Sequence, residues 1–256
     1  MERNLKLTLA YDGHDLAGWQ VQPGRPTVQG ILVSAIEHLT GEKTLPQGSG
    51  RTDAGVHALA QVASVPIRSP IPASNLRKAL NDTLPESIRI LNVEEAAPDF
   101  HARKSARAKT YRYRIYREEI CPPFLARYVY HHPYPLKEEA MIQSADEVLG
   151  EHDFTSFAAV DPERNRENLP LSNIRTIYAS QWQREGPELM YTVRGNGFLH
   201  HMVRNLVGTF LMIGKGSLTR QDLKRILEAR NRSAAAATAP GSGLFLVGVE
   251  YGEQTV

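Results

Sequence analysis

The feature that most constrains the fold of this chain is a hydrophobic pattern that changes period along the sequence. Near the N-terminus apolar residues alternate with polar or small ones, which predicts a half-buried strand. Apolar residues at helical spacing follow, with Thr27 placed to cap a helix that runs to about Leu39. The same reasoning predicts a strand over 56–65, a helix from Ser74 to Leu80 and a strand over 88–93. The first half is therefore expected to be a β-α-β-α-β series. The alternating residues are Leu5, Leu7, Leu9 and Tyr11.

The second half mixes strands and helices in a similar proportion. Strands are expected over 109–117, 174–182, 189–194 and 244–251, with 127–131 pairing with the first of them. Helices are expected over 135–149 and 200–213, and a third is capped by Thr219 with Asp222 three residues on. The charges and prolines of 158–172 predict a surface loop.

No internal sequence repeat is present, but the region 98–108 is a natural boundary between the halves. The pattern predicts an α+β protein with two subdomains, residues 1–104 and 105–256.

The composition is that of an ordinary soluble globular protein, with 41% hydrophobic and 23% charged residues among 256. The longest apolar runs fall far short of the roughly 18 residues that a membrane span needs, and the N-terminus lacks the apolar core of a signal peptide. Cys121 is the single cysteine, so no disulfide can form within the chain. We expect a cytoplasmic protein without a membrane partner.

A net charge of +2 says little about nucleic acid, but the distribution of charge says more. From His101 to Arg117 the chain carries seven cations and no acid, with Tyr111, Tyr113 and Tyr116 interleaved. Cations neutralise phosphates and aromatic faces stack on exposed bases, so this run favours a polyanionic partner. A solvated edge strand is the alternative. The cations are Arg103, Lys104, Arg107, Lys109, Arg112, Arg114 and Arg117.

The stretch from Gly50 to Ala58, GRTDAGVHA, holds Asp53 between two glycines with Arg51 two residues before it. Glycine reaches positive φ at little cost, and aspartate can bond its own backbone, so the stretch predicts a turn. A carboxylate in such a loop beside a cation is a candidate catalytic group. By chemistry alone, most such residues cap a helix or stabilise a turn.

The full string resembles the active-site signature of the TruA family, tRNA pseudouridine synthases that act on the anticodon arm. Other segments resemble family motifs in the same order, so the resemblance covers nearly the whole chain. Leu16 departs from the pattern, because the family usually has an aromatic residue there. The further segments are Tyr11-Asp12-Gly13, Gly18-Trp19-Gln20, Lys109-Thr110-Tyr111-Arg112-Tyr113, Gly197 to Asn205, Ala239-Pro240 and Gly243-Leu244.

The resemblance implies two ferredoxin-like (RRM-like) halves whose antiparallel sheets meet around a basic cleft. It implies that Asp53 is the catalytic carboxylate, acting on uridines 38, 39 and 40 of the anticodon stem-loop. Tyr111 matches a tyrosine that packs on the target base, and Arg204 matches an arginine that pairs with the acid. Arg51 resembles an arginine that helps to flip the target nucleotide. From the residues alone, Tyr111 also fits a core tyrosine and Arg204 a solvated helix arginine.

Uridine isomerisation transfers no electrons and releases no group, so neither a cofactor nor a metal is expected. The pair His200-His201 suggests a metal site, but adjacent residues on a helix point about a quarter-turn apart. His57 is expected to pack locally.

The resemblance further implies a homodimer in which one tRNA contacts both subunits. The first alternative function is a non-catalytic tRNA-binding or folding module. The second is a metal-free hydrolase with Asp53 as nucleophile, which would need a second acid that the motif does not supply.

Overall fold

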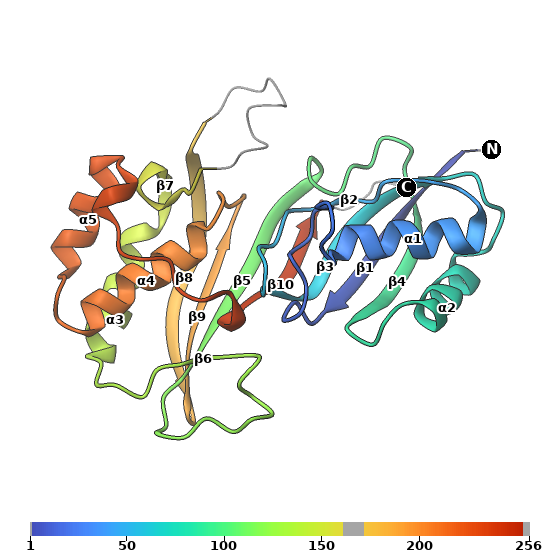
Figure 1. Cartoon of the computed structure of the whole chain (residues 1–256). Coiled ribbons are helices and arrows are strands. Elements are labelled where there is room, and N and C mark those ends of the chain that lie inside the picture. Colours follow the sequence, from blue (N-terminus) through green and yellow to red (C-terminus); the bar gives the residue numbers. More distant parts are fainter. Residues whose placement is uncertain (1, 161–171, 253–256) are drawn as a thin grey trace. The chain divides into compact units, whose positions relative to one another are not determined.

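The computed structural model describes residues 2–160 and 172–252 (Figure 1). The fold is α+β with mostly antiparallel strands, as predicted. The chain divides into two compact units, Met1–Lys109 with Phe245–Val256, and Thr110–Leu244. The division into domains at 1–104 and 105–256 stays a prediction. No helix within the described ranges has the length and apolar character that a membrane span requires.

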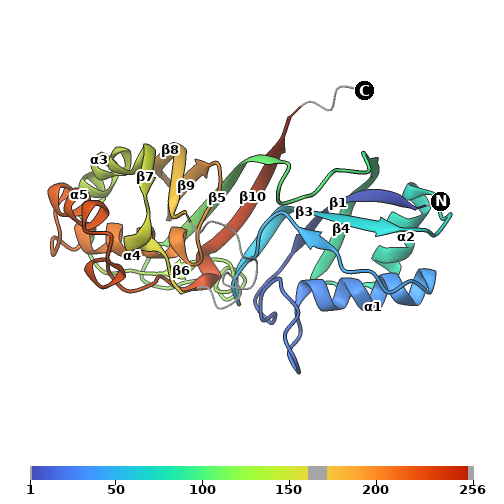
Figure 2. The ribbon, with the colours of Figure 1, turned by 90° about the horizontal axis from the view of Figure 1, so that it is seen from above.

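The first unit is built on the strand order β4-β1-β3-β10. β3 pairs antiparallel with β1 and parallel with β10, the last strand of the chain (Figure 2). The helices α1 and α2 contact each other, and α2 packs on β4. The elements are β1 Arg3–Tyr11, α1 Val28–Thr40, β2 Gln47–Gly48, β3 His57–Ile67, α2 Ala73–Thr83, β4 Ile88–Ala96 and β10 Leu244–Tyr251.

The predicted β-α-β-α-β series of the first half is confirmed. The alternating apolar residues of β1 are all buried, because one face of the strand turns to the core. Thr27 caps α1 by accepting a hydrogen bond from Gly30 N–H. The predicted cap of α2 is wrong, since α2 begins one residue before Ser74 and its cap position is Pro72. Proline suits this place because a helix start has no use for its missing N–H.

The second unit has the strand order β5-β9-β8-β7, with the short β6 parallel to β5. The predicted hairpin is confirmed as β8 and β9. α3 and α5 contact each other, and α3 also contacts α4 and β8. β5 begins in the first unit and continues into the second. The elements are β5 Ala106–Tyr116, β6 Tyr130–His131, α3 Glu138–Ser144, β7 Gly150–Asp153, β8 Ile174–Glu185, β9 Glu188–Gly195, α4 Met202–Gly214 and α5 Arg220–Ala229.

The helix predicted over 135–149 is wrong in both bounds. α3 covers only Glu138–Ser144, and the chain then tightens into a 3-10 turn over Ala145–Val148. Gly150 follows with φ +87° and starts β7, which pairs antiparallel with β8. Strand pairing therefore overrides the helical spacing of the apolar residues before it. The predicted capping box of Thr219 and Asp222 is confirmed at α5.

Of the loop predicted over 158–172, residues 161–171 lie outside the described residues. The helix predicted from His200 begins at Met202 instead. The difference arises at His201, whose φ of +59° is left-handed and cannot belong to a right-handed helix.

His132 is a buried titratable group in the second unit. Its ring stacks on Tyr130 at 5.6 Å and meets Tyr134 edge-on at 5.4 Å. Only 4% of the residue is exposed, and its Nε2 is buried without a hydrogen-bond partner. Burial, aided by the charges of Lys215, Arg117 and His131, lowers the pKa of His132 to about 4.

Because the native pKa lies below the ordinary value, the unfolded chain takes up this proton first as the pH falls. The contribution of His132 to stability is thus complete above about pH 6.5 and is lost as the pH falls toward 4. His132→Phe keeps the aromatic contacts and cannot titrate. Urea unfolding at pH 7.5 and 4.5 should show wild type losing on the order of 2 kcal/mol more than the variant. Equal losses would contradict the assignment.

Candidate active site

Asp53 lies in a tight turn directly before β3. The N–H of Val56 donates to Asp53 O at 3.2 Å, and Gly55 has a φ of +76°. The predicted turn is confirmed. The element that follows is a strand, so Asp53 caps no helix here. The residue is partly exposed.

The chain that leads into this turn is held from the interior of the first unit. Gln61 is fully buried in β3, and its Nε2 donates to Gly50 O at 3.0 Å. The Oε1 of the same amide accepts from Ser49 Oγ at 2.6 Å. The ammonium of Lys109, at the start of β5, donates to Ser49 O. Two successive carbonyls, at residues 49 and 50, are therefore bound by buried side chains.

Two further contacts fix Thr52, the residue before the acid. Tyr11 Oη lies 2.8 Å from Thr52 Oγ1, and the N–H of Trp19 donates to Thr52 O at 3.0 Å. Gln61 Nε2 also donates to the Tyr11 oxygen at 3.3 Å, which directs the phenolic proton toward Thr52. Burial raises the pKa of Tyr11 to about 12, so this proton is retained at neutral pH.

The two glycine motifs near the N-terminus let the backbone approach this turn. A Cβ on Gly13 would lie 2.0 Å from Val56 O, and a Cβ on Gly18 would lie 2.5 Å from Thr52 O. Gly18 also has a φ of +96°, which L side chains rarely adopt. Leu16, the residue that departs from the family pattern, is buried, and its carbonyl accepts from Gly55 N–H at 3.3 Å.

His57, next to the turn, is buried and stacks on Phe245 of β10 with ring centroids 4.7 Å apart. Its Nδ1 lies 3.1 Å from Gly13 N and from Asp12 Oδ1. The expectation of local packing is confirmed, and the histidine joins β3, β10 and the N-terminal loop.

The second unit holds two of the predicted site residues. Tyr111 in β5 is buried and meets the ring of Phe198 edge-on at 5.0 Å. Arg204, in the first turn of α4, is half-buried. It is tied to Ala239, because Arg204 Nε donates to Ala239 O at 2.8 Å and Ala239 N–H donates to Arg204 O at 3.1 Å. Arg204 is therefore a side chain oriented by its bond to the backbone.

Asp53 and Arg51 belong to the first unit, and Tyr111 and Arg204 to the second. Arg51 is exposed on the loop, two residues before the acid.

The geometry that was expected for the two adjacent histidines is wrong. Neither lies in α4, and their ring centroids are 4.0 Å apart because the left-handed backbone of His201 folds the pair together. His200 Nδ1 lies 3.0 Å from Val160 O, and Ala159 N–H donates to His200 O at 2.9 Å. His200 thus anchors the chain that precedes residue 161.

The basic run from 101 to 117 divides into parts with different surroundings. Arg114 makes two hydrogen bonds to Glu188, of 2.7 and 2.6 Å, and Lys109 is buried. Arg103, Lys104 and Arg107 are exposed in the first unit. Counting charges along the sequence therefore overestimates the surface that this run offers to a polyanion.

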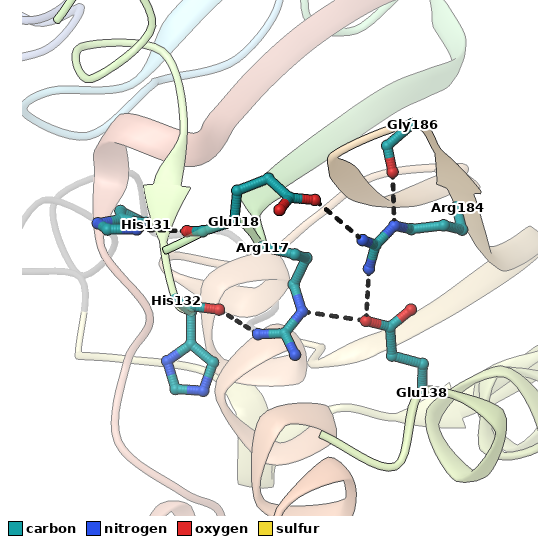
Figure 3. A network of polar contacts seen from close by, with 7 residues as sticks. All are labelled: Arg117, Glu118, His131, His132, Glu138, Arg184 and Gly186. Carbon is teal, nitrogen blue, oxygen red and sulfur yellow. Dashed lines mark hydrogen bonds and ion pairs between the residues drawn. The ribbon is translucent and has the colours of Figure 1, made fainter. Parts of the chain in front are cut away.

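Arg117 anchors the segment 118–134 rather than facing solvent. Its Nε donates to Glu138 Oε1 at 3.0 Å, and its guanidinium also binds the carbonyl of His132 (Figure 3). Glu138 further accepts from Arg184 at 2.7 Å, and the ring of His131 contacts the carbonyl of Glu118 at 2.9 Å. Because the carboxylate of Glu138 binds two guanidiniums, these side chains form a structural network.

Sequence reasoning missed the residues that hold the site in place. Gln61 is signalled only by a polar amide between apolar neighbours in a strand. Asn205, fully buried in α4, donates to Phe157 O at 2.7 Å and accepts from Thr238 and Arg232. It fixes the segment that precedes Ala239 and so supports Arg204.

Gly18 and Gly24 offer a matched test of the close approach to the turn. Both have positive φ, but an added Cβ at Gly24 would meet nothing within 4 Å. Gly24→Ala should cost about 1–2 kcal/mol of unfolding free energy from backbone strain alone. Gly18→Ala should cost about 2–4 kcal/mol, because overpacking against Thr52 is added. Urea denaturation measures both, and equal losses would mean that Gly18 is not needed for the approach.

Comparison with known proteins assigns the chain to a family. The family model described as tRNA pseudouridine synthase matches residues 8–103 and 145–252. A tRNA pseudouridine synthase A of Solibacter usitatus is 53% identical, covering 97% of this chain and 100% of its own. That of Moorella thermoacetica is 46% identical over 96% and 99%. A solved Cbf5-Nop10-Gar1 complex matches 80% of this chain and 54% of its own at 14% identity, with a TM-score of 0.33, too weak a likeness to support an inference. The chain belongs to the tRNA pseudouridine synthase family.

Proposed function

We propose that this protein isomerises uridine to pseudouridine at positions 38, 39 and 40 in the anticodon stem-loop of tRNA, with Asp53 as the catalytic carboxylate. The observation that carries the proposal is the construction of the Asp53 turn. Buried groups bind the chain at residues 49, 50 and 52, yet the acid itself stays partly exposed. A partly exposed acid on a backbone fixed by buried groups is what a positioned catalytic group requires.

The reaction breaks the bond from C1′ to N1 of the base and forms one from C1′ to C5. A carboxylate can start it by attacking C6 of the ring, by attacking C1′, or by removing the C2′ proton to give a glycal. The proton on C5 then leaves and N1 gains one, so atoms and electrons balance without a redox cofactor or a metal.

The other roles follow from the family resemblance and are part of the proposal. Tyr111 packs on the target base and takes the C5 proton, and its contact with Phe198 fixes the ring. Arg204 pairs with the Asp53 carboxylate and holds it ionised, with its own direction set by Ala239. Arg51, exposed beside the acid, helps to hold the target nucleotide out of the stem.

The proposed arrangement is two ferredoxin-like halves whose sheets meet around a basic cleft. The exposed cations Arg103, Lys104 and Arg107 would neutralise tRNA phosphates there. We further propose a cytoplasmic homodimer, in which one tRNA contacts both subunits. The alternative, a tRNA-binding module without catalysis, predicts binding that survives loss of Asp53 and no change to the nucleoside.

Pseudouridine mapping on an unmodified tRNA transcript tests the catalytic role of Asp53. Wild type, in chelator and with no added cofactor, should give product in the anticodon arm. Asp53→Asn should lower the rate by about a thousandfold or more, since the amide is neither a nucleophile nor a base. Asp82→Asn removes an exposed acid of α2 and should leave the rate unchanged. Product from Asp53→Asn at the wild-type rate would remove the acid from the mechanism.

The homodimer is tested by size-exclusion chromatography with light scattering, with and without tRNA. We expect about twice the chain mass of 28.5 kDa at micromolar concentration. A protein that stays monomeric and still modifies tRNA would show that one subunit suffices.

A further inference from the structure

We infer that Lys109 is a positioning residue of the reaction, whose buried ammonium fixes the loop that presents Asp53. This inference rests on the proposed catalytic role of Asp53. In the sequence Lys109 is one cation of the basic run from 101 to 117, and the inference gives it a structural role at the Asp53 loop instead.

The environment of Lys109 is unusual for a lysine. Only 9% of the residue is exposed. An ammonium removed from water loses its hydration, and burial is tolerated only where protein acceptors replace the water. A neutral side chain of the same length would fill this space without that cost. The positive charge of Lys109 is therefore explained by the group that its ammonium binds.

The atoms around the ammonium belong to the approach to the catalytic turn. Lys109 Nζ donates to Ser49 O, and it would lie 3.1 Å from a Cβ on Gly50. Glycine at position 50 thus leaves the room in which the ammonium reaches the backbone. Asp53 follows three residues after Gly50.

Gln61 binds the neighbouring carbonyl of the loop, because its Nε2 donates to Gly50 O at 3.0 Å. Its other contacts, to Ser49 Oγ and Tyr11 Oη, leave it no freedom to turn. Lys109 supplies the charged hydrogen bond of the pair, and charge-assisted bonds are about twice as strong as neutral ones. Loss of the ammonium should therefore loosen the loop more than loss of a neutral donor would.

The contact with Ser49 O argues against an RNA-binding role for Lys109. A phosphate contact needs an accessible ammonium, whereas this one is buried and bound to the protein's own backbone. Removal of the charge should then slow the chemical step and leave tRNA affinity nearly unchanged.

The test uses the full-length protein with Lys109→Met, which keeps the length of the side chain and removes the charge. Lys78→Met makes the same change on the exposed face of α2 and serves as the matched control. The single-turnover rate at saturating protein reports the chemical step, and filter binding reports the dissociation constant for tRNA. Hydrogen–deuterium exchange of the peptide over 49–56 reports the order of the loop.

For Lys109→Met we expect the rate to fall about tenfold or more, with the dissociation constant within about twofold of wild type. Exchange over 49–56 should rise, and exchange over α2 should not. Lys109→Arg retains a charged donor and should recover part of both the rate and the protection. Lys78→Met should match wild type in every measurement.

A wild-type rate in Lys109→Met would overturn the inference. So would a loss that appears only in tRNA affinity, because Lys109 would then be an RNA contact. If Lys109→Met does not fold, the same rate and exchange measurements are made on Gln61→Met, which removes the hydrogen bond to Gly50 O. Wild-type protein that forms no pseudouridine would refute the proposed function, and the exchange comparison would still decide whether Lys109 orders the loop.

Discussion

The arrangement of this protein depends on how a few buried polar groups bind the backbone before Asp53. Within the turn the N–H of Val56 donates to Asp53 O, and a backbone hydrogen bond of this kind could not hold a carboxylate in place alone. Gln61 and Lys109 bind the preceding carbonyls, and Tyr11 binds Thr52. A buried network in which each donor meets an acceptor selects one geometry, because any other would leave polar groups unpaired in the interior.

The strands that carry these groups explain why the fold is needed. Tyr11 ends β1, Gln61 lies in β3, and Lys109 lies in β5, two residues before Tyr111. Residues distant in sequence thus act on one loop through the pairing of strands. In the second unit, Asn205 and Ala239 support Arg204 in a similar way, with α4 as the base.

Much of the fold could be predicted from the sequence, because its long elements have clear hydrophobic periods. The alternation in β1, the cap of α1 and the capping box of α5 are local signals, and each is confirmed. The prediction failed where tertiary pairing decides the outcome. α3 ends early because the chain after it pairs with β8, and His201 adopts a left-handed conformation that its sequence neighbours do not signal. The motif identifies Asp53 as the candidate acid. Gln61 and Lys109, which hold its loop, lie in strands whose hydrophobic patterns do not distinguish them from other strand residues.

The pairing of β10 with β3 has a consequence for how the protein is made. β10 is the last strand of the chain, yet it belongs to the first unit, where Phe245 stacks on His57 beside the Asp53 turn. A ribosome releases β1 and β3 long before β10 emerges, so the first unit stays incomplete until β10 has been made. Nascent chains therefore pass through a stage in which the acid is present without the strand beside it. The order of the elements thereby delays the completed surroundings of Asp53 until β10 has paired with β3.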